Sequence, residues 1–460
     1  MAASPATLAE IVLWDRVVGA IAWDPARQLG SFEYAEGFLP SAIEIAPLTM
    51  PLRAGVHQFP ELPARSFLGL PGLLADSLPD RFGNLLIDQW LARQGRAPSD
   101  FNPVERLCYL GARGMGALEF RPALRSGRDV AAPVQIDALV QLANEALARK
   151  AGLATAPIPA SGQRAAASAD SEDEARAAAL RDILRVGTSA GGARAKAVVA
   201  FNPNTGEFRS GQVDAPPGFE HWLLKFDGVS ENRDKEALAD PRGYGRIEYA
   251  YHLMARAAGL TMNDCRLYEE NGRAHFMTRR FDRPAGPVKK LHLQSLCALA
   301  HYDFNAAGAY GYEQAFAVLR ALDLPHAAME EMFRRAAFNV IARNQDDHTK
   351  NIAFLMDQGG RWSLAPAYDI AYSYNPDGEW TARHQMTLNG KNDGFNFDDL
   401  IACARAADVK PARAKSILAA IGEAVRRWPE FAAAARIEER DTRRVAATHR
   451  LALATPPPRG

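Results

Sequence analysis

The chain has 460 residues, of which 48% are hydrophobic and 23% are charged. This length predicts about two to three domains with ample core, and the composition is that of a soluble globular protein. Lysine plus arginine and aspartate plus glutamate both total 54, so nothing in the overall charge requires a nucleic-acid or anionic-membrane partner.

The cysteine pattern argues against a structural zinc site and against a disulfide framework. The four cysteines are far apart and form no Cys-x-x-Cys motif: Cys108, Cys265, Cys297 and Cys403. We therefore expect a reducing, cytoplasmic location. Asp15 and Arg16 interrupt the first apolar run, and no run of about 18 apolar residues occurs, so we expect neither a signal peptide nor a membrane span.

The first third of the chain is predicted to be β-rich and then helical. Residues 10–55 cluster strand formers between glycine and proline, and apolar residues at helical spacing predict a helix near 80–91. Asn102-Pro103 is typical of a helix start. We assign residues 8–153 to an N-terminal subdomain. The following 154–178 are rich in alanine, proline and acid, which predicts a flexible linker.

The remaining chain predicts a sheet-rich part followed by a helical part. A strand is expected at 220–226, a helix at 244–260, and a hairpin around Asn271-Gly272. From about residue 290 the pattern becomes mainly helical, with helices expected at 314–324, 327–343, 398–407 and 413–428. This order predicts an α+β, two-lobed kinase-like fold, with an ATP-binding N-lobe over 179–288 and a helical C-lobe over 289–455.

Three polar side chains suggest phosphoryl transfer. Asp346 and Asn351 have the Asp-x4-Asn spacing, and Asp369 follows a short strand-like hairpin. Protein kinases place a catalytic base and two Mg²⁺ ligands in this order. Asp346 would take the proton of the acceptor hydroxyl, and Asn351 and Asp369 would supply the hard oxygens that Mg²⁺ prefers. The adjacent Asp347 does not have the required spacing. The alternative is a solvated polar loop.

Lys225 lies within an apolar strand pattern, where an unpaired lysine would be costly to bury. A kinase would pair it with the α- and β-phosphates of ATP and with Glu248 on the next helix. The alternative is an exposed edge-strand lysine. Residues 189–196 form a glycine-rich loop whose N–H groups could bind phosphate, but neither a Walker A nor a kinase glycine motif is present, so the segment alone favours a flexible loop. The tryptophans and phenylalanines are interpreted as core, and His348 as orienting the Asp346 loop.

The sequence resembles the HipA family, the serine/threonine-kinase toxins of HipBA-type toxin–antitoxin modules. The most specific matches are residues 338–351 and 364–370. Further matches are residues 189–197, 221–225, 248–249, 280–283 and 389–391, with looser likeness at 78–81 and 111–120.

The resemblance implies roles for individual residues. Asp346 would be the catalytic base, and Asn351 and Asp369 the Mg²⁺ ligands. Ser189 would begin a P-loop-like segment ending at Lys196, and its autophosphorylation would eject the loop and silence ATP binding. Met277 and Arg279 would lie near the adenine. The expected ATP-binding residues are Lys225, Ser189, Gly191, Gly192, Lys196, Glu248, Met277, Arg279, His348 and Lys350.

The resemblance also implies partners. These are a HipB-like helix-turn-helix antitoxin, which supplies most of the DNA binding, and a protein substrate such as an aminoacyl-tRNA synthetase. Three departures from the family pattern concern the substrate and the loop: the insertion at 154–178, Arg194-Ala195, and Asp347 in place of a small residue. A small-molecule kinase using the same residues is the alternative function. A pseudokinase is disfavoured because Lys225, Asp346, Asn351 and Asp369 are all present.

Overall fold

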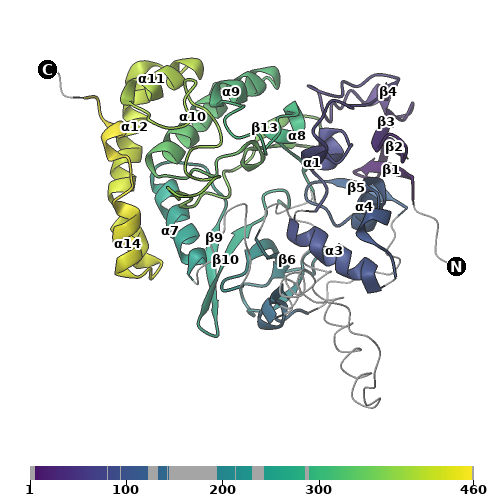
Figure 1. The fold of residues 1–460 in the computed structure, drawn as a ribbon, viewed down its shortest axis with the longest axis horizontal. Coiled ribbons are helices and arrows are strands. Elements are labelled where there is room, and N and C mark those ends of the chain that lie inside the picture. Colours follow the sequence, from purple (N-terminus) through teal and green to yellow (C-terminus); the bar gives the residue numbers. More distant parts are fainter. Residues whose placement is uncertain are drawn as a thin grey trace, which may run out of the picture.

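The computed structural model describes residues 6–79, 81–93, 95–122, 133–141, 143–144, 194–212, 214–229, 243–284 and 290–457 (Figure 1). The linker predicted over 154–178 lies outside these residues, as do Ser189, Gly191 and Gly192. Among the helices that the structure describes, none combines the length and hydropathy that a membrane crossing requires.

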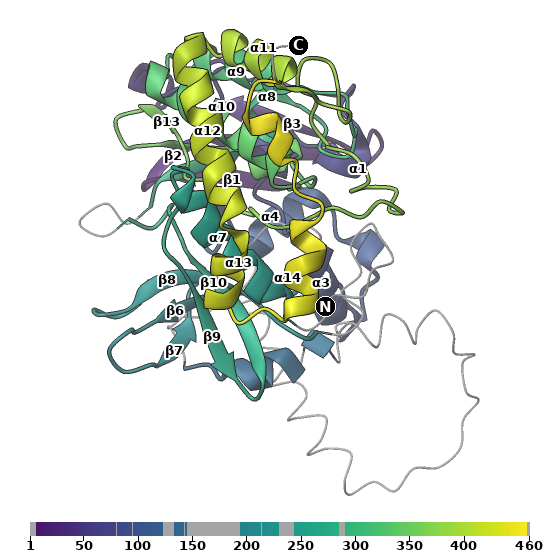
Figure 2. The same cartoon turned by 90° about the vertical axis from the view of Figure 1, so that its left-hand side faces the viewer.

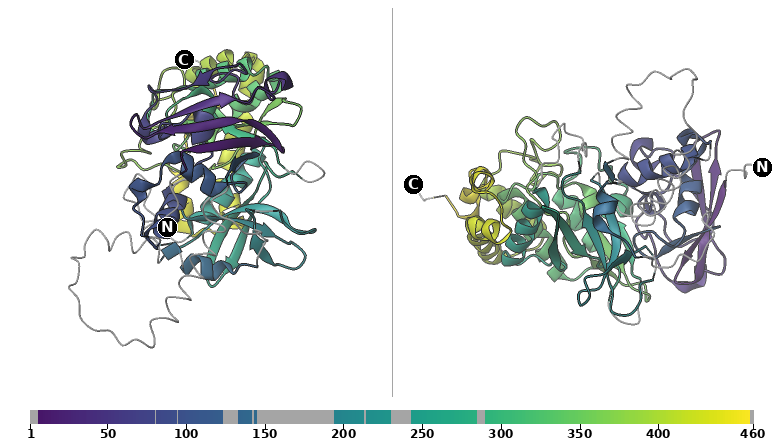
Figure 3. Two further views of the ribbon diagram at one scale, coloured as in Figure 1. Left: turned by 90° about the vertical axis from the view of Figure 1, so that its right-hand side faces the viewer. Right: turned by 90° about the horizontal axis from the view of Figure 1, so that it is seen from below.

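The N-terminal part is built on a five-stranded antiparallel sheet in the order β4-β3-β2-β1-β5, seen face-on in the left view of Figure 3. Its strands are β1 (Leu8–Leu13), β2 (Arg16–Asp24), β3 (Leu29–Tyr34), β4 (Val56–His57) and β5 (Leu118–Arg121). Its helices are η1 (Leu39–Ser41), α1 (Ala64–Phe67), α2 (Gly72–Ala75), α3 (Arg81–Arg93), η2 (Pro98–Asp100) and α4 (Pro103–Leu110).

The start of α4 confirms the helix start predicted from Asn102-Pro103. Pro103 occupies the first turn, and the Asn102 side chain accepts the Glu105 backbone N–H at 2.9 Å. This cap satisfies one of the N–H groups that a helix start leaves without a partner. Buried Val104 and Leu107 then place α4 in the core beneath the first sheet. The same core cluster includes Met356, so the N-terminal part packs directly against the C-terminal half.

The second sheet has the order β7-β6-β8-β10-β9. Its strands are β6 (Lys196–Phe201), β7 (Phe208–Ser210), β8 (Glu220–Lys225), β9 (Cys265–Glu270) and β10 (Arg273–Arg279). The hairpin predicted at Asn271-Gly272 is confirmed, because both residues are left-handed, with φ of 47° and 73°. The predicted helix is α7 (Tyr244–Ala257), and it starts close to β10: a Cβ at Gly245 would lie 2.4 Å from the Ala274 carbonyl oxygen.

The C-terminal half combines a small sheet with a group of helices, seen in the upper part of Figure 2. The sheet has the order β11-β12-β13, with β11 (His292–Ser295), β12 (Ala353–Met356) and β13 (Trp362–Leu364). The helices are α8 (Leu296–Ala300), α9 (Tyr312–Ala321), α10 (His326–Ile341), η3 (Thr349–Asn351), α11 (Phe397–Ala406), α12 (Pro411–Arg426), α13 (Trp428–Ala434), α14 (Glu439–Ala446) and η4 (Leu451–Ala454). The four predicted long helices are confirmed as α9, α10, α11 and α12. One large apolar core joins them to α7.

The expectation of mainly helical structure from residue 290 missed β11. Two polar side chains of this strand, His292 and Gln294, face the interior instead of solvent. Gln294 Nε2 donates to the Ile45 carbonyl oxygen at 2.8 Å, which satisfies part of that buried amide. The strand has only four residues, and the polar members of its alternation are the buried ones, so its pattern does not predict an apolar buried face.

Candidate active site

The loop after α10 carries the predicted catalytic aspartate. α10 ends at Ile341, and Arg343 takes a left-handed conformation with φ of 60°. A residue of this conformation stops a helix, so the chain continues as an irregular loop to η3. The Asn351 side-chain amide then donates to the Asp346 carbonyl oxygen at 2.8 Å. This bond closes the loop and holds the two predicted functional residues side by side.

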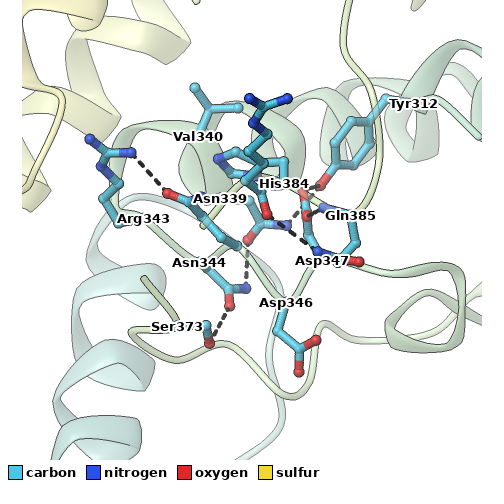
Figure 4. A network of polar contacts seen from close by, with 12 residues as sticks. Tyr312, Asn339, Val340, Arg343, Asn344, Asp346, Asp347, Ser373, His384 and Gln385 are labelled. Atoms are coloured by element: carbon cyan, nitrogen blue, oxygen red, sulfur yellow. Dashed lines mark hydrogen bonds and ion pairs between the residues drawn. The ribbon is translucent and has the colours of Figure 1, made fainter. Parts of the chain in front are cut away.

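The two adjacent aspartates of this loop have opposite surroundings (Figure 4). Asp347 is buried, and its carboxylate accepts hydrogen bonds from the Tyr312 hydroxyl at 2.8 Å, His384 Nδ1 at 2.9 Å and the Gln385 N–H at 2.8 Å. The Asp346 side chain keeps 30% exposure, and its carboxylate points away from this network. Of the pair, Asp346 is therefore the carboxylate that solvent can reach.

Asp347 explains the departure from a small residue at this position. Arginine has only donors, so Arg450 Nη1 donates to His384 Nε2 at 3.1 Å, and the imidazole proton lies on Nδ1, facing Asp347. Burial raises the pKa of the Asp347 carboxyl. The His384 imidazole and the hydrogen bonds from Tyr312 and Gln385 outweigh burial and hold this pKa below its ordinary value. Asp347 is thus an ionised anchor beneath the loop.

Replacing this anchor tests its contribution to stability. Asp347→Asn will lower the free energy of unfolding by about 3 kcal/mol near pH 7, because buried donors lose their carboxylate. The contribution of Asp347 is present above its unfolded-state pKa of about 3.9 and disappears as pH falls through its lower folded-state pKa. The difference between wild type and variant will therefore shrink in acid. Urea unfolding at about pH 7 and about pH 3 measures both values.

The exposed Asp377 offers the control, since Asp377→Asn makes the same chemical change outside the buried network. We expect its unfolding curve to match that of wild type. A loss of stability in Asp347→Asn that is independent of pH would contradict the ionised-anchor interpretation.

Lys225, Glu248 and Asp369 form a compact ionic cluster. Lys225 ends β8, Glu248 lies in the second turn of α7, and Asp369 follows β13. Lys225 Nζ lies 2.5 Å from Glu248 Oε1 and 2.5 Å from Asp369 Oδ1. The alternative of an exposed edge-strand lysine is wrong, because β8 lies between β6 and β10 and the lysine side chain is only 11% exposed.

The members of this cluster shift one another's pKa values. Burial lowers the pKa of the Lys225 ammonium, but the charges of Asp369 and Glu248 outweigh burial and raise it above its ordinary value. Burial raises the pKa of Asp369, but the charges of Lys225 and Lys196 outweigh burial and lower it to about 2. Burial raises the pKa of Glu248. Lys225 and Asp369 are therefore fully ionised near neutral pH.

Lys196 and His348 connect this cluster with its surroundings. Lys196 is buried at the start of β6, directly opposite Lys225 in the strand register, and its charge lowers the pKa of Asp369. His348 also lowers the pKa of Asp369, and its Nε2 lies 3.7 Å from Asp346 Oδ1. The Tyr368 hydroxyl, next to Asp369 in the chain, donates to the carbonyl oxygen of Lys350, next to Asn351, at 2.5 Å. This contact links the Asp346 loop to the segment that carries Asp369.

The other predicted ATP-binding residues are placed less centrally. The Met277 side chain is fully buried in the core cluster of the second sheet. Arg279 pairs with Glu220 at 3.3 Å at the end of β10. The Lys350 ammonium lies 4.7 Å from the centre of the Phe304 ring. Nucleotide contacts by these residues stay predictions, as do those of Ser189, Gly191 and Gly192 outside the described residues.

The sequence interpretation missed Trp380 by assigning the tryptophans to the core. Trp380 is only partly buried, and its indole N–H donates to Asp346 Oδ1 at 2.7 Å. It lies 34 residues after Asp346, in a stretch without regular structure. No periodic pattern could have pointed to it.

Comparisons with known proteins agree with this arrangement. The family of HipA-like C-terminal domains matches residues 188–428, and that of HipA N-terminal domains matches residues 9–121. The chain belongs to the HipA family. The α+β, two-lobed kinase-like fold predicted from the sequence is thereby confirmed.

The chain is similar to one relative in sequence and to one solved structure in fold. It is 27% identical over 375 residues to a protein of Sinorhizobium fredii named "Putative kinase Y4mE", covering 78% of this chain and 76% of that protein. HipA of Shewanella oneidensis, solved in a complex with HipB and operator DNA, has a similar fold, with a TM-score of 0.65 at 17% identity, covering 97% of this chain and 96% of the other. Both likenesses agree with the assignment of the chain to the HipA family.

Proposed function

We propose that this HipA-family protein is an ATP-dependent serine/threonine protein kinase, the toxin of a toxin–antitoxin module. The observation that carries the proposal is the Lys225–Glu248–Asp369 cluster beside the loop of Asp346 and Asn351. A lysine paired with a helix glutamate, an Asp-x4-Asn loop and a later aspartate are the parts that kinases use. In this chain Lys225, Glu248 and Asp369 form one ionic cluster, Asn351 contacts Asp346, and the Tyr368–Lys350 hydrogen bond links the two segments, which supports the proposal.

Each residue then has a role in transfer. Asp346 orients the acceptor hydroxyl and takes its proton as the hydroxyl oxygen bonds to the γ-phosphorus of ATP, while the bond from this phosphorus to the β–γ bridging oxygen breaks and ADP leaves. Lys225, held by Glu248, contacts the α- and β-phosphates. Asn351 and Asp369 would hold Mg²⁺, which suits their hard oxygens and neutralises charge on the phosphates. The Asn351 nitrogen is engaged by the Asp346 carbonyl, so its oxygen is the atom for the metal.

The finer parts of the proposal concern substrate and control. The acceptor is a serine or threonine of a protein, with an aminoacyl-tRNA synthetase as the candidate that the family suggests, and the cell would respond with growth arrest. Ser189 is the proposed site of self-phosphorylation, which would switch off ATP binding. A HipB-like antitoxin with a helix-turn-helix is the proposed partner. The Shewanella HipA complex with HipB and DNA supports this partner by similarity of fold.

Self-phosphorylation gives a direct test of the protein-kinase assignment. Incubation of the purified chain with Mg²⁺ and γ-labelled ATP will place phosphate on Ser189, because a hydroxyl at the start of a phosphate-binding loop lies next to the donor. Mass spectrometry of proteolytic peptides identifies the site. Ser189→Ala will remove this phosphate and leave the chain able to bind ATP.

Ser161→Ala is the matched control, because it removes a serine from the predicted linker. We expect it to incorporate as much phosphate as wild type. The absence of phosphate from every serine and threonine, combined with phosphorylation of a small-molecule acceptor, would favour the small-molecule kinase.

A further inference from the structure

Three hydrogen bonds and the covalent chain form a closed path through Asp346. The Trp380 indole N–H donates to Asp346 Oδ1 at 2.7 Å. The Gln385 side-chain amide donates to the Trp380 carbonyl oxygen, and the Gln385 backbone N–H donates to Asp347 Oδ1 at 2.8 Å. Asp347 is covalently joined to Asp346, so the path returns to its start. We call this path the Trp380 network, consisting of Asp346, Asp347, Gln385 and Trp380.

The Trp380 network is attached to a buried, multiply hydrogen-bonded carboxylate. Asp347, its deepest member, also accepts hydrogen bonds from the Tyr312 hydroxyl of α9 and from the His384 imidazole (Figure 4). Arg450 Nη1 contacts the other nitrogen of this imidazole. The segment before Gln385 has a second attachment, since Gln345 Nε2 donates to the Thr381 carbonyl oxygen at 3.3 Å. The indole therefore reaches Asp346 from a segment that is fixed to both neighbours of Asp346 in the chain.

The position of this bond indicates a role beyond solvation of a charge. A buried carboxylate needs donors to offset the loss of water. Asp346 is 30% exposed, so water can solvate it without help from an indole. The indole N–H on Oδ1 restricts the rotation of the carboxylate and therefore the direction of Oδ2. A general base acts only within hydrogen-bond reach of the proton it takes, so this direction matters for transfer.

We propose that Trp380 is a positioning residue of the phosphoryl-transfer site: its indole N–H holds Asp346 Oδ1 and thereby directs the carboxylate toward the acceptor hydroxyl. This inference rests on the proposed function, because it assumes that Asp346 is the base. Trp380 acts through Asp346. The Trp380 network makes the geometry of the base depend on Asp347 and Gln385.

Trp380→Phe removes the N–H and keeps most of the ring, which makes it the appropriate substitution. We expect kcat for phosphate transfer from Mg-ATP to fall by about 10- to 100-fold, the range for a misplaced catalytic group. The Kd of Mg-ATP should stay within about twofold of the wild-type value, because the ionic cluster of Lys225, Glu248 and Asp369 is unchanged. Trp380→His, which keeps a ring N–H, should retain more of the kcat than Trp380→Phe.

Trp14→Phe is the matched control. It also removes one indole N–H, which donates to the Lys290 carbonyl oxygen at 2.8 Å in the N-terminal part. We expect its kcat and its thermal midpoint to match wild type.

Indole resonances give a readout that packing alone would not move. The chain has 7 tryptophans, and the Trp380 signal in a ¹⁵N spectrum is identified by its loss in Trp380→Phe. We expect this signal to shift in Asp346→Asn, whereas the Trp14 signal stays in place. An unmoved Trp380 signal would overturn the proposal.

The kinetic outcomes separate this inference from the function beneath it. A wild-type chain that transfers no phosphate would overturn the proposed function and this inference with it. An active wild type with an equal kcat in Trp380→Phe would overturn the positioning role alone. A rise of kcat in Trp380→Phe would also overturn it, because the indole would then obstruct the base.

Discussion

Asp346→Asn will reduce phosphate transfer by about 10³-fold or more while the chain stays folded and still binds Mg-ATP. Asparagine has nearly the same shape, but it cannot take the acceptor proton. The backbone carbonyl that Asn351 contacts is unchanged, so the loop stays closed. The side chain is 30% exposed and asparagine keeps Oδ1 as an acceptor for the Trp380 indole, so the free energy of unfolding should change by less than about 0.5 kcal/mol.

The measurement is the initial rate of transfer from γ-labelled ATP, with the Kd of Mg-ATP and the urea midpoint recorded on the same samples. Asp323→Asn serves as control, because Asp323 is exposed in the turn after α9. In cells, expression of wild type should slow growth unless an antitoxin is coexpressed, and Asp346→Asn should not slow it. Phosphopeptides present with wild type and absent with Asp346→Asn would identify the substrate. Transfer at the wild-type rate by the purified variant would remove Asp346 from its role.

The site residues predicted from the sequence lie close together along the chain. Asp346, Asn351 and Asp369 lie within 24 positions, and the local chain fixes their order. Spacing therefore carries information about their arrangement. Lys225 and Glu248 are also close in sequence, and a strand followed by a helix brings them together. The ion pair expected between them is present at 2.5 Å.

The contacts that sequence reasoning missed depend on long connections. Trp380 reaches Asp346, and Arg450 reaches His384, only after the irregular segment and the C-terminal helices are placed. The same limit applies to Asp347, which looked like a departure from the family and is an anchor whose partners come from α9 and from residues 384–385. Hydrophobic periodicity reports which face of an element is buried. It contains no information about polar partners on another element.

Because Lys225 contacts Asp369 and Glu248 directly, its replacement should affect both ATP binding and stability. Lys225→Met will abolish Mg-ATP binding and lower the free energy of unfolding by about 3–5 kcal/mol near pH 7, because it leaves two carboxylates beside an apolar chain. The surface change Lys415→Met is the control for charge removal, and we expect no loss of stability from it.

The pH dependence of this loss has a definite sign. In wild type the pKa of Asp369 is about 2, so its stabilising contribution is present above the unfolded-state pKa of about 3.9 and disappears as pH falls toward about 2. In Lys225→Met the cation is gone and burial remains, so the pKa values of Asp369 and Glu248 rise. As pH falls from about 7 to about 4, protonation of these carboxylates removes their unpaired charges and reduces the variant's loss of stability. Urea unfolding across this range should show the two proteins converging.

Lys225→Arg separates the electrostatic role of this residue from its chemical one. Arginine keeps the charge, so Glu248 and Asp369 remain paired and most of the stability lost in Lys225→Met should return. Its planar, branched guanidinium cannot place a compact ammonium at the phosphates, so transfer should stay at least about tenfold below wild type. A Lys225→Arg variant with wild-type kcat would mean that the cluster needs only a positive charge. An unstable Lys225→Arg variant would mean that the site accepts only the shape of lysine. The expected result, a stable protein with impaired transfer, would separate the role of Lys225 at the phosphates from its role in holding Glu248 and Asp369 together.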